Sequence, residues 1–395
     1  GDVSILTETV TTVRLTTPDT PETSGLVGNA RTLRLLEVAE EVFDAFQRHA
    51  DDSPYGMAQI LYGDWCDPVD MFGTGRVGDP TTRGRGRGVN TRLSAHLFLS
   101  IIEAVDILRS ATVAEELRSA SLEIDTTGLE SFADGLRAAV VKWAWEEGSD
   151  DSSAGFISAI HEYRTDGSTP DYDAGKTGYT LGSMQGRDFD GRPRRDIVTQ
   201  AYGLAMLGTR RDYLTPVEEA DRMISRVLRT VDERFFDPTL GLLLFTTPMA
   251  NSREAVDYVG RMGVVPSGTA ENGEYHHGQA FLHYYRLGLP GQSGVVWRQL
   301  QPMLSVSRDE TIAGPFDMPC TSYVADPDDP HFGKAMYFGL SGSTDWLIEI
   351  FQRMAGIELN LHDPAIPDLT IAPHLPAELE GNLTFKRIIH VSTSE

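Results

Sequence analysis

Apolar residues recur at helical spacing along most of this chain, and this repeat constrains the fold more than any other feature of the sequence. In one stretch the apolar positions are Leu33, Leu36, Val38, Val42 and Phe46, which lie close to one face of a helix. Comparable stretches cover residues 93–108, 129–145, 197–207, 216–231, 277–287, 296–304 and 335–354. The pattern predicts a mainly α-helical protein.

Long connections rich in Gly, Pro and Asp separate these helices, and the connection over 165–195 is too long for a tight bundle. Helices joined in this way suit a toroid whose loops build a site at one end. Residues 242–246, 369–371 and 383–385 have β-strand character instead. The sequence therefore predicts a helical region over 1–365 and the start of a C-terminal β-sandwich-like segment over 366–395.

The formal net charge of −24 argues against nucleic acid as a partner, because binding to phosphate backbones needs clustered Lys and Arg. The chain has no apolar run long enough to predict a membrane-spanning helix, and its first residues do not resemble a signal peptide. Its two cysteines, Cys66 and Cys320, do not make a disulfide framework. These features predict a cytoplasmic protein that binds neither membranes nor nucleic acid.

The first concentration of chemically suited side chains is Asp64, Trp65 and Asp67, in a loop that ends at Pro68. An enzyme that cleaves a glycosidic bond needs an aromatic face for the sugar ring and a carboxyl group to protonate the bridging oxygen. An ordinary acidic loop is the competing interpretation, because the chain carries 58 acidic residues. Taken alone, this motif is a weak signal.

The second concentration runs from Glu271 to His277, directly before an apolar helical stretch. A histidine that opens a helix is well placed to hold an oxyanion. A metal site is the alternative, but His276, His277 and His283 lack the spacing of zinc-binding helices and no thiolate completes a ligand set. We therefore expect no metal here, and we expect His283 to be a structural or surface residue.

The third concentration is Ser341 and Gly342 at the start of the last predicted helix. A hydroxyl and a glycine amide could hold a phosphate there, although ordinary helix capping is the competing interpretation. The glycine-rich residues 84–88 lack the Gly-Lys-Ser/Thr ending of a nucleotide-binding loop. We interpret them as a mobile loop beside the site.

Taken in order, five segments resemble landmarks of glycoside hydrolase family ninety-four, the cellobiose-phosphorylase-like glycoside phosphorylases. They are residues 1–6, 63–67 (Gly-Asp-Trp-Cys-Asp), 195–200, 241–248 and 271–273 (Glu-Asn-Gly). The resemblance implies that Asp67 is the general acid and that His277, Ser341 and Gly342 bind phosphate. It also implies sugar contacts from Asp64, Trp65, Arg164, Asp166, Gln200 and Glu271.

Several positions depart from the family pattern: Cys66 replaces Asn, residues 89–90 replace Glu-Ser, one glycine is missing after Gly273, and Ser341 replaces Thr. The first and third departures leave the identity of the sugar open. The resemblance covers the C-terminal part of the family's catalytic region, so it implies an (α/α)6 toroid that is incomplete on its N-terminal side. Another polypeptide or a missing segment would complete this barrel, and a homodimer is expected by analogy with the family.

These residues predict phosphorolysis with inversion at the anomeric carbon. Protonated Asp67 would donate its proton to the leaving oxygen while inorganic phosphate, as co-substrate, attacks from the opposite face of a β-linked gluco-oligosaccharide. No further cofactor is expected. Two alternatives remain open: an inverting hydrolase in which Glu271, Glu274 or Asp196 activates water, and a catalytically silent subunit for glycan binding or assembly.

Overall fold

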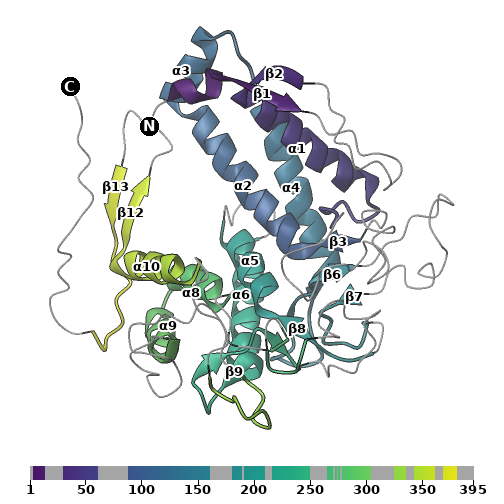
Figure 1. The fold of residues 1–395 in the computed structure, drawn as a ribbon, viewed down its shortest axis with the longest axis vertical. Coiled ribbons are helices and arrows are strands. Elements are labelled where there is room, and N and C mark those ends of the chain that lie inside the picture. Colours follow the sequence, from purple (N-terminus) through teal and green to yellow (C-terminus); the bar gives the residue numbers. More distant parts are fainter. Residues whose placement is uncertain are drawn as a thin grey trace.

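The computed structural model describes residues 3–13, 30–60, 88–160, 180–188, 191–209, 216–249, 265–269, 272–273, 275, 278–303, 324–334, 342–360 and 368–379. This part of the chain is mainly α-helical, with short strands that form small, separate sheets (Figure 1). No helix in these ranges is long and apolar enough to cross a membrane.

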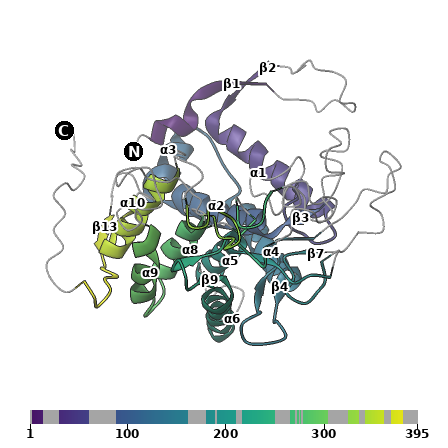
Figure 2. The same cartoon turned by 60° about the horizontal axis from the view of Figure 1, so that its bottom comes forward.

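Helix α5 (Ile197–Gly208) lies at the centre of the core, and every residue from Ile197 to Leu207 is buried. It is apolar on all sides, as expected for a helix surrounded by protein. Helices α2 (Thr91–Arg109) and α8 (Gly278–Leu287) pack on α5, and α10 (Gly342–Ala355) packs on α8. These four helices form one continuous inner row (Figure 2).

A second row of helices packs against the first. Helix α4 (Thr126–Trp143) covers α2, α6 (Val217–Thr230) covers α5, and α9 (Ser293–Leu300) covers α8. Helix α6 is strongly amphipathic: Met223, Ile224 and Val227 face the core, and arginines occupy its outer face. It continues into a π-helix, η4 (Val231–Phe235), and α9 continues into the short 3-10 helix η6 (Gln301–Met303).

The inner helices α2 and α5 run in the same direction. The first amide of α2, at Thr91, donates to the carbonyl of Ser158, whose hydroxyl donates to Asp196, the residue that caps α5. One to two turns further along each helix, the rings of His96 and Tyr202 are in contact, with centroids 5.1 Å apart. The two helices therefore begin at the same end of the molecule and stay together.

The N-terminal part adds a ribbon and a less buried helix. The 3-10 helix η1 (Val3–Thr7) precedes the antiparallel strands β1 (Thr9–Val13) and β2 (Ala30–Arg34), which lead into α1 (Leu35–Asp52). Only Leu36 and Ala50 of α1 are fully buried, although Phe43 and Phe46 pack partly on the main core. Helix α3 (Ala111–Ser119) follows α2 and was not predicted from the sequence.

The remaining strands are short pairs that tie connections to helix ends. They are β3 (Val89–Asn90), β6 (Ala159–Ile160) and β7 (Thr180–Leu181) in one sheet, β4 (Trp145–Glu146) with β5 (Gly155–Phe156), β8 (Arg195–Asp196) with β11 (Thr246–Thr247), β9 (Phe236–Asp237) with β10 (Leu242–Leu243), and β12 (Ile357–Asn360) with β13 (Asp368–Ile371).

The predicted helical stretches agree with the structure within the described residues except at some ends: Leu33 belongs to β2 and Trp145 belongs to β4. The last one is confirmed only from Gly342 onward, because residues 335–341 lie outside the described part. The single strand predicted at 242–246 is wrong in detail: β10 ends at Leu243 and β11 begins at Thr246, and the two strands have different partners. The strand at 369–371 is confirmed as part of β13, whereas 383–385 lies outside the described part.

Candidate functional site

A small three-stranded sheet brings several connections together at the end of the molecule where α2 and α5 begin. In it, β6 lies between β3 and β7, so that Val89 pairs with Ile160 and Ile160 pairs with Thr180. We call β3, β6 and β7 the anchor sheet. Because α2 follows β3 directly and is capped by Asn90, this sheet also fixes the start of α2.

The segment that contains Asp64, Trp65 and Asp67 leaves the described part beside the anchor sheet and returns there. The amide of Ile60 donates to the carbonyl of Gly88 at 2.8 Å, and Gln59 forms a bridge with Val89. Residues 61–87 are therefore joined to the described part at two positions that are in direct contact. The three predicted residues themselves lie outside the described residues.

The segment that contains Arg164 and Asp166 has the same kind of attachment. It leaves at Ile160 at the end of β6 and returns at Thr180 at the start of β7, and these two residues are paired across the sheet. Arg164 and Asp166 also lie outside the described residues. The structure thus brings together the attachment points of two segments that the sequence singled out, although they lie far apart along the chain.

Ser158 joins the anchor sheet to the first turn of α5. Its amide donates to the carbonyl of Leu181, and its hydroxyl donates to Asp196 in a short hydrogen bond. The Asp196 carboxylate also accepts from the amide and hydroxyl of Thr199, at 2.7 and 2.8 Å, as an N-cap residue does. Asp196 is buried, and its carboxylate is committed to holding the start of α5.

Gln200 is the one predicted sugar-contacting residue that lies wholly within the described part. Its side chain is 0% exposed: the amide nitrogen donates to the carbonyls of Phe156 and Asp196, and the oxygen accepts from the amide of Phe156 at 2.9 Å. Both amide hydrogens are thus used within the protein. Gln200 holds β5 against α5, and its contact with a sugar stays a prediction.

Gly155 permits this close approach between β5 and α5. A Cβ atom at this position would lie 2.5 Å from Oε1 of Gln200 and 2.6 Å from Nη1 of Arg195, and the φ angle of +153° lies in a range that other residues rarely adopt. Only glycine fits here without displacing the two polar side chains that lie against it.

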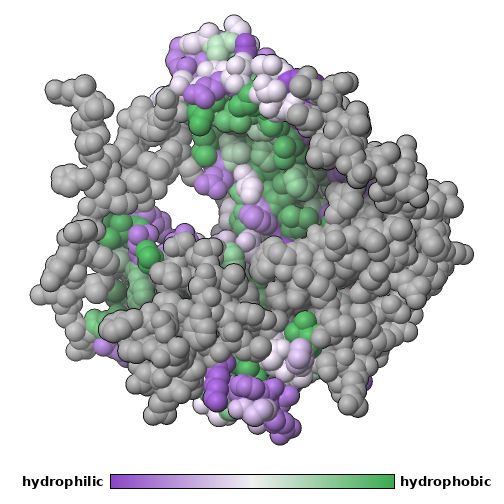
Figure 3. Space-filling model, in the orientation of Figure 1, coloured by the Kyte–Doolittle hydropathy of each residue, from purple (hydrophilic) through white to green (hydrophobic). Residues whose placement is uncertain are grey.

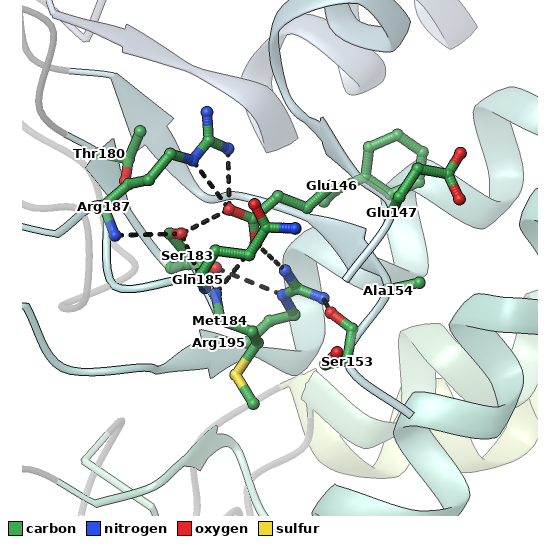
Figure 4. Close-up of polar contacts among 12 residues, drawn as sticks. Glu146, Glu147, Ser153, Ala154, Thr180, Ser183, Met184, Gln185, Arg187 and Arg195 are labelled. Carbon is green, nitrogen blue, oxygen red and sulfur yellow. Dashed lines mark hydrogen bonds and ion pairs between the residues drawn. The ribbon is translucent and has the colours of Figure 1, made fainter. Parts of the chain in front are cut away.

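A buried ion pair between Glu146 and Arg195 lies next to the anchor sheet (Figure 4). Nη2 of Arg195 donates to Oε2 of Glu146 at 2.6 Å, while Nη1 donates to the carbonyl of Ser153 and Nε to that of Gly182. Burial lowers the pKa of Arg195 to about 10, so the guanidinium stays charged at neutral pH. The side chain of Arg195 is 0% exposed and that of Glu146 is 2% exposed. Because neither charge is in contact with water, each needs its partner and further hydrogen bonds to offset the cost of burial.

The same glutamate holds the residues that follow β7. Glu146 accepts from the hydroxyl of Ser183, from the amide of Met184 at 2.9 Å and from Nε of Arg187 at 2.9 Å (Figure 4). Glu146 therefore links three parts of the chain: the end of α4 through β4, the return of the segment 161–179, and the entry to α5 through Arg195.

Asp188 closes the turn that follows β7. Its carboxylate accepts from the hydroxyl of Thr180 and from the amides of Gly182 and Ser183, at 2.8 to 3.0 Å. Burial raises the pKa of Asp188 to about 6, although these hydrogen bonds and the guanidinium of Arg194 oppose the shift. The carboxylate shapes the turn by accepting from successive backbone amides.

The segment from Glu271 to His277, which the sequence also singled out, lies partly within the described residues. Asn272 and Thr269 close a tight turn, and a Cβ atom at Gly273 would overlap Met249, at 2.0 Å from its Cγ. Met249 follows β11, which pairs with β8 at the entrance to α5. The Asn-Gly pair is thus joined to the same end of α5, whereas Glu271, Glu274, His276 and His277 lie outside the described residues.

Gly342 is the first described residue of α10, while Ser341 lies outside the described residues. His283 is fully buried on α8, which confirms a structural position and excludes a surface one.

Among the described side chains, no group of three or more His, Cys, Asp or Glu residues could hold a metal ion.

Sequence reasoning missed the network around Glu146, Ser158, Ser183 and Asp188. These residues carry no periodic signal, and their partners are remote in sequence, as the pairing of Glu146 with Arg195 shows. One feature of the sequence could have pointed to this network: the charged residues Arg195 and Asp196 stand directly before an apolar helix.

No family model matches this chain, and no curated protein matches it.

Proposed function

We propose that this protein is an inverting glycoside phosphorylase that cleaves a β-linked gluco-oligosaccharide with inorganic phosphate and releases a sugar 1-phosphate. The observation that carries the proposal is the anchor sheet. It joins the attachment points of the segment with Trp65 and Asp67 to those of the segment with Arg164 and Asp166, beside the first turns of α2 and α5. The two segments that carry residues with the chemistry of a sugar site thus leave from and return to one small sheet.

The arrangement of the helices supports the finer architectural proposal. An inner row of α2, α5, α8 and α10 is covered by an outer row of α4, α6 and α9. This alternation along the chain is what an (α/α)6 toroid requires, and we propose that the chain forms part of one. In such a toroid, the segments before α2, α5, α8 and α10 would meet at one end.

In the proposed reaction, the Asp67 carboxyl group protonates the glycosidic oxygen as the bond to the anomeric carbon breaks. A phosphate oxygen forms the new bond to that carbon from the opposite face, which inverts its configuration. His277, Ser341 and the amide of Gly342 would hold the phosphate, and Trp65, Arg164 and Asp166 would hold the sugar. Phosphate is already anionic, so one catalytic carboxyl group suffices.

An inverting hydrolase on the same scaffold needs a second carboxylate to activate water. Of the three candidates for that role, Asp196 is described, and its carboxylate accepts from Ser158 and Thr199 at a buried helix cap. A carboxylate used in this way is poorly placed to take a proton from water. This observation argues against Asp196 as the residue that would activate water.

The test measures the products formed from β-1,2-, β-1,3- and β-1,4-linked glucose oligomers with and without phosphate. We expect turnover that requires phosphate, and a loss of at least about a hundred-fold in Asp67→Asn, as the removal of a general acid implies. Asp51→Asn, an exposed aspartate of α1, is the matched control and should keep full activity. Equal release of free sugar without phosphate would establish the hydrolase instead. Oligosaccharide binding with no turnover in either condition would establish a silent subunit.

A further inference from the structure

A continuous array of aromatic side chains crosses the inner row of helices. The ring of Tyr202 on α5 lies 5.1 Å from that of His96 on α2, 5.5 Å from that of Phe281 and 6.3 Å from that of Tyr285, both on α8. Tyr285 in turn contacts Tyr284 at 5.4 Å, edge to face. We call these residues the inner aromatic array: His96, Tyr202, Phe281, Tyr284 and Tyr285.

Charged and polar groups lie along the array. The guanidinium of Arg353 on α10 lies 4.9 Å from the centre of the Tyr284 ring. Glu103 lies two turns beyond His96 on α2, on the same side of the helix, and both residues are exposed. Burial raises the pKa of the Tyr285 phenol, and the nearby charge of Glu103 adds to this shift.

The rings differ in their exposure in a way that leaves a surface for a ligand. Tyr202 is 6% exposed and forms the base of the array, whereas Phe281, Tyr284 and Tyr285 are half-buried and His96 is exposed. The space-filling view, drawn in the orientation of Figure 1, shows an apolar surface in the upper part of the molecule with an opening beside it (Figure 3). The exposed side chain of His96 brings one edge of the array to solvent.

This combination of groups suits a sugar chain. The carbon-bound hydrogens of a pyranose ring form an apolar face that packs on an aromatic ring, while its hydroxyl groups need charged or polar partners at the edge. Tyr202 lies only about 8 Å along α5 from the capped end, given the rise of a helix. The array therefore begins close to the end to which the proposed sugar site is tethered.

We propose that the inner aromatic array binds the units of a β-linked gluco-oligosaccharide that extend away from the bond to be cleaved. The protein then prefers longer oligomers to disaccharides. The identity of the sugar and the existence of a cleaved bond rest on the proposed function, whereas the binding surface itself does not require turnover.

The test measures the dissociation constants of β-linked glucose disaccharides and hexasaccharides by calorimetry, without phosphate, for the wild type, His96→Ala and Tyr285→Leu. His96→Ala removes an exposed ring, and Tyr285→Leu keeps much of the buried volume without the aromatic face. Phe236→Ala is the matched control, because Phe236 is an aromatic residue 38% exposed on β9, away from the array. Thermal unfolding confirms that each variant is folded.

We expect the wild type to bind the hexasaccharide more tightly, and each array variant to weaken that binding on the order of ten-fold while the disaccharide changes less than two-fold. Equal effects on both lengths, no effect in either variant, or no binding by the wild type would overturn the proposal. Length-dependent binding that is lost in the variants, in a protein without phosphorolysis, would refute the proposed function and leave the array as a glycan-binding surface.

Discussion

His283 lies on α8 with its imidazole fully buried, and neither ring nitrogen has a hydrogen-bond partner. Burial, reinforced by the charge of Arg286, lowers the pKa of His283 to about 3. A neutral imidazole in this position destabilises the fold, because its polar atoms have lost water without gaining partners.

We expect His283→Leu to stabilise the protein at pH 7 by about 1 kcal/mol and to flatten its acid response. In the wild type, the unfolded chain takes up a proton at His283 below pH 6.5 while the folded state does not, so stability is lost as the pH falls from 6.5 toward 3. The slope reaches about 1.4 kcal/mol per pH unit. Urea unfolding at several pH values measures it.

The titration of Asp188 changes the stability with pH in the opposite direction to that of His283. The raised pKa of Asp188 means that the folded state binds a proton more readily than the unfolded chain, so its contribution is fully present below about pH 3.8 and is lost as the pH rises through 6. Asp188 is present in both the wild type and His283→Leu. Its contribution therefore cancels when the unfolding free energies of the two proteins are subtracted at each pH. Parallel stability curves for the two proteins would contradict the account of His283.

The pair formed by Glu146 and Arg195 supports a second prediction at this scale. Glu146→Ala leaves a buried guanidinium without its counter-charge and should cost about 3 to 5 kcal/mol of unfolding free energy. A double variant, Glu146→Ala with Arg195→Met, should lose clearly less than the sum of the single losses. Urea unfolding of the wild type, the two single variants and the double variant measures the coupling free energy between Glu146 and Arg195. Strictly additive losses would show that the two side chains do not stabilise each other.

The helices differ widely in how much of their surface the fold covers. Helix α5 is buried along nearly its whole length, whereas α1 buries only Leu36 and Ala50 completely. Local opening should therefore need nearly the full unfolding free energy in α5 and far less in α1. Hydrogen exchange followed by mass spectrometry checks this order: we expect the amides of α1 to exchange at least about a hundred-fold faster. Equal protection would contradict the packing described here.

The start of α2 offers an element-scale test of the anchor sheet. Oδ1 of Asn90 accepts from the amide of Leu93 at 3.0 Å, and Asn90 also belongs to β3. Asn90→Ala removes the cap and should cost about 1 kcal/mol. Asn90→Ser retains a neutral accepting oxygen and should cost less. Chemical denaturation compares the two, and equal losses would show that the capping bond is unimportant.

Elements could be predicted from the sequence where the information is local. The amphipathic repeats identified α2, α4 and α6 because each helix carries its own apolar face, and a continuous apolar run identified α5. The anchor sheet could not be predicted, because its strands have two residues each and pair across long stretches of chain. For the same reason Ser158 and Glu146 escaped notice: their roles depend on partners that only the fold brings near.

At the scale of the whole molecule, the inner and outer rows of helices place the starts of α2 and α5 at one end, together with the attachment points of the predicted catalytic segments. The sequence named the residues of the proposed site, and the fold explains how segments so far apart in the chain are tethered together. The net charge of −24 disfavours a polyanion as the ligand, which agrees with the uncharged sugar that we propose.

The stereochemistry of the product tests the central proposal most directly. The protein is incubated with the β-linked glucose oligomer that it consumes and with inorganic phosphate, and the reaction is followed by phosphorus and proton nuclear magnetic resonance. Inverting phosphorolysis predicts that α-glucose 1-phosphate forms from the start and that none forms with Asp67→Asn. Free glucose without a sugar phosphate, or a β-anomeric phosphate, would contradict the proposal.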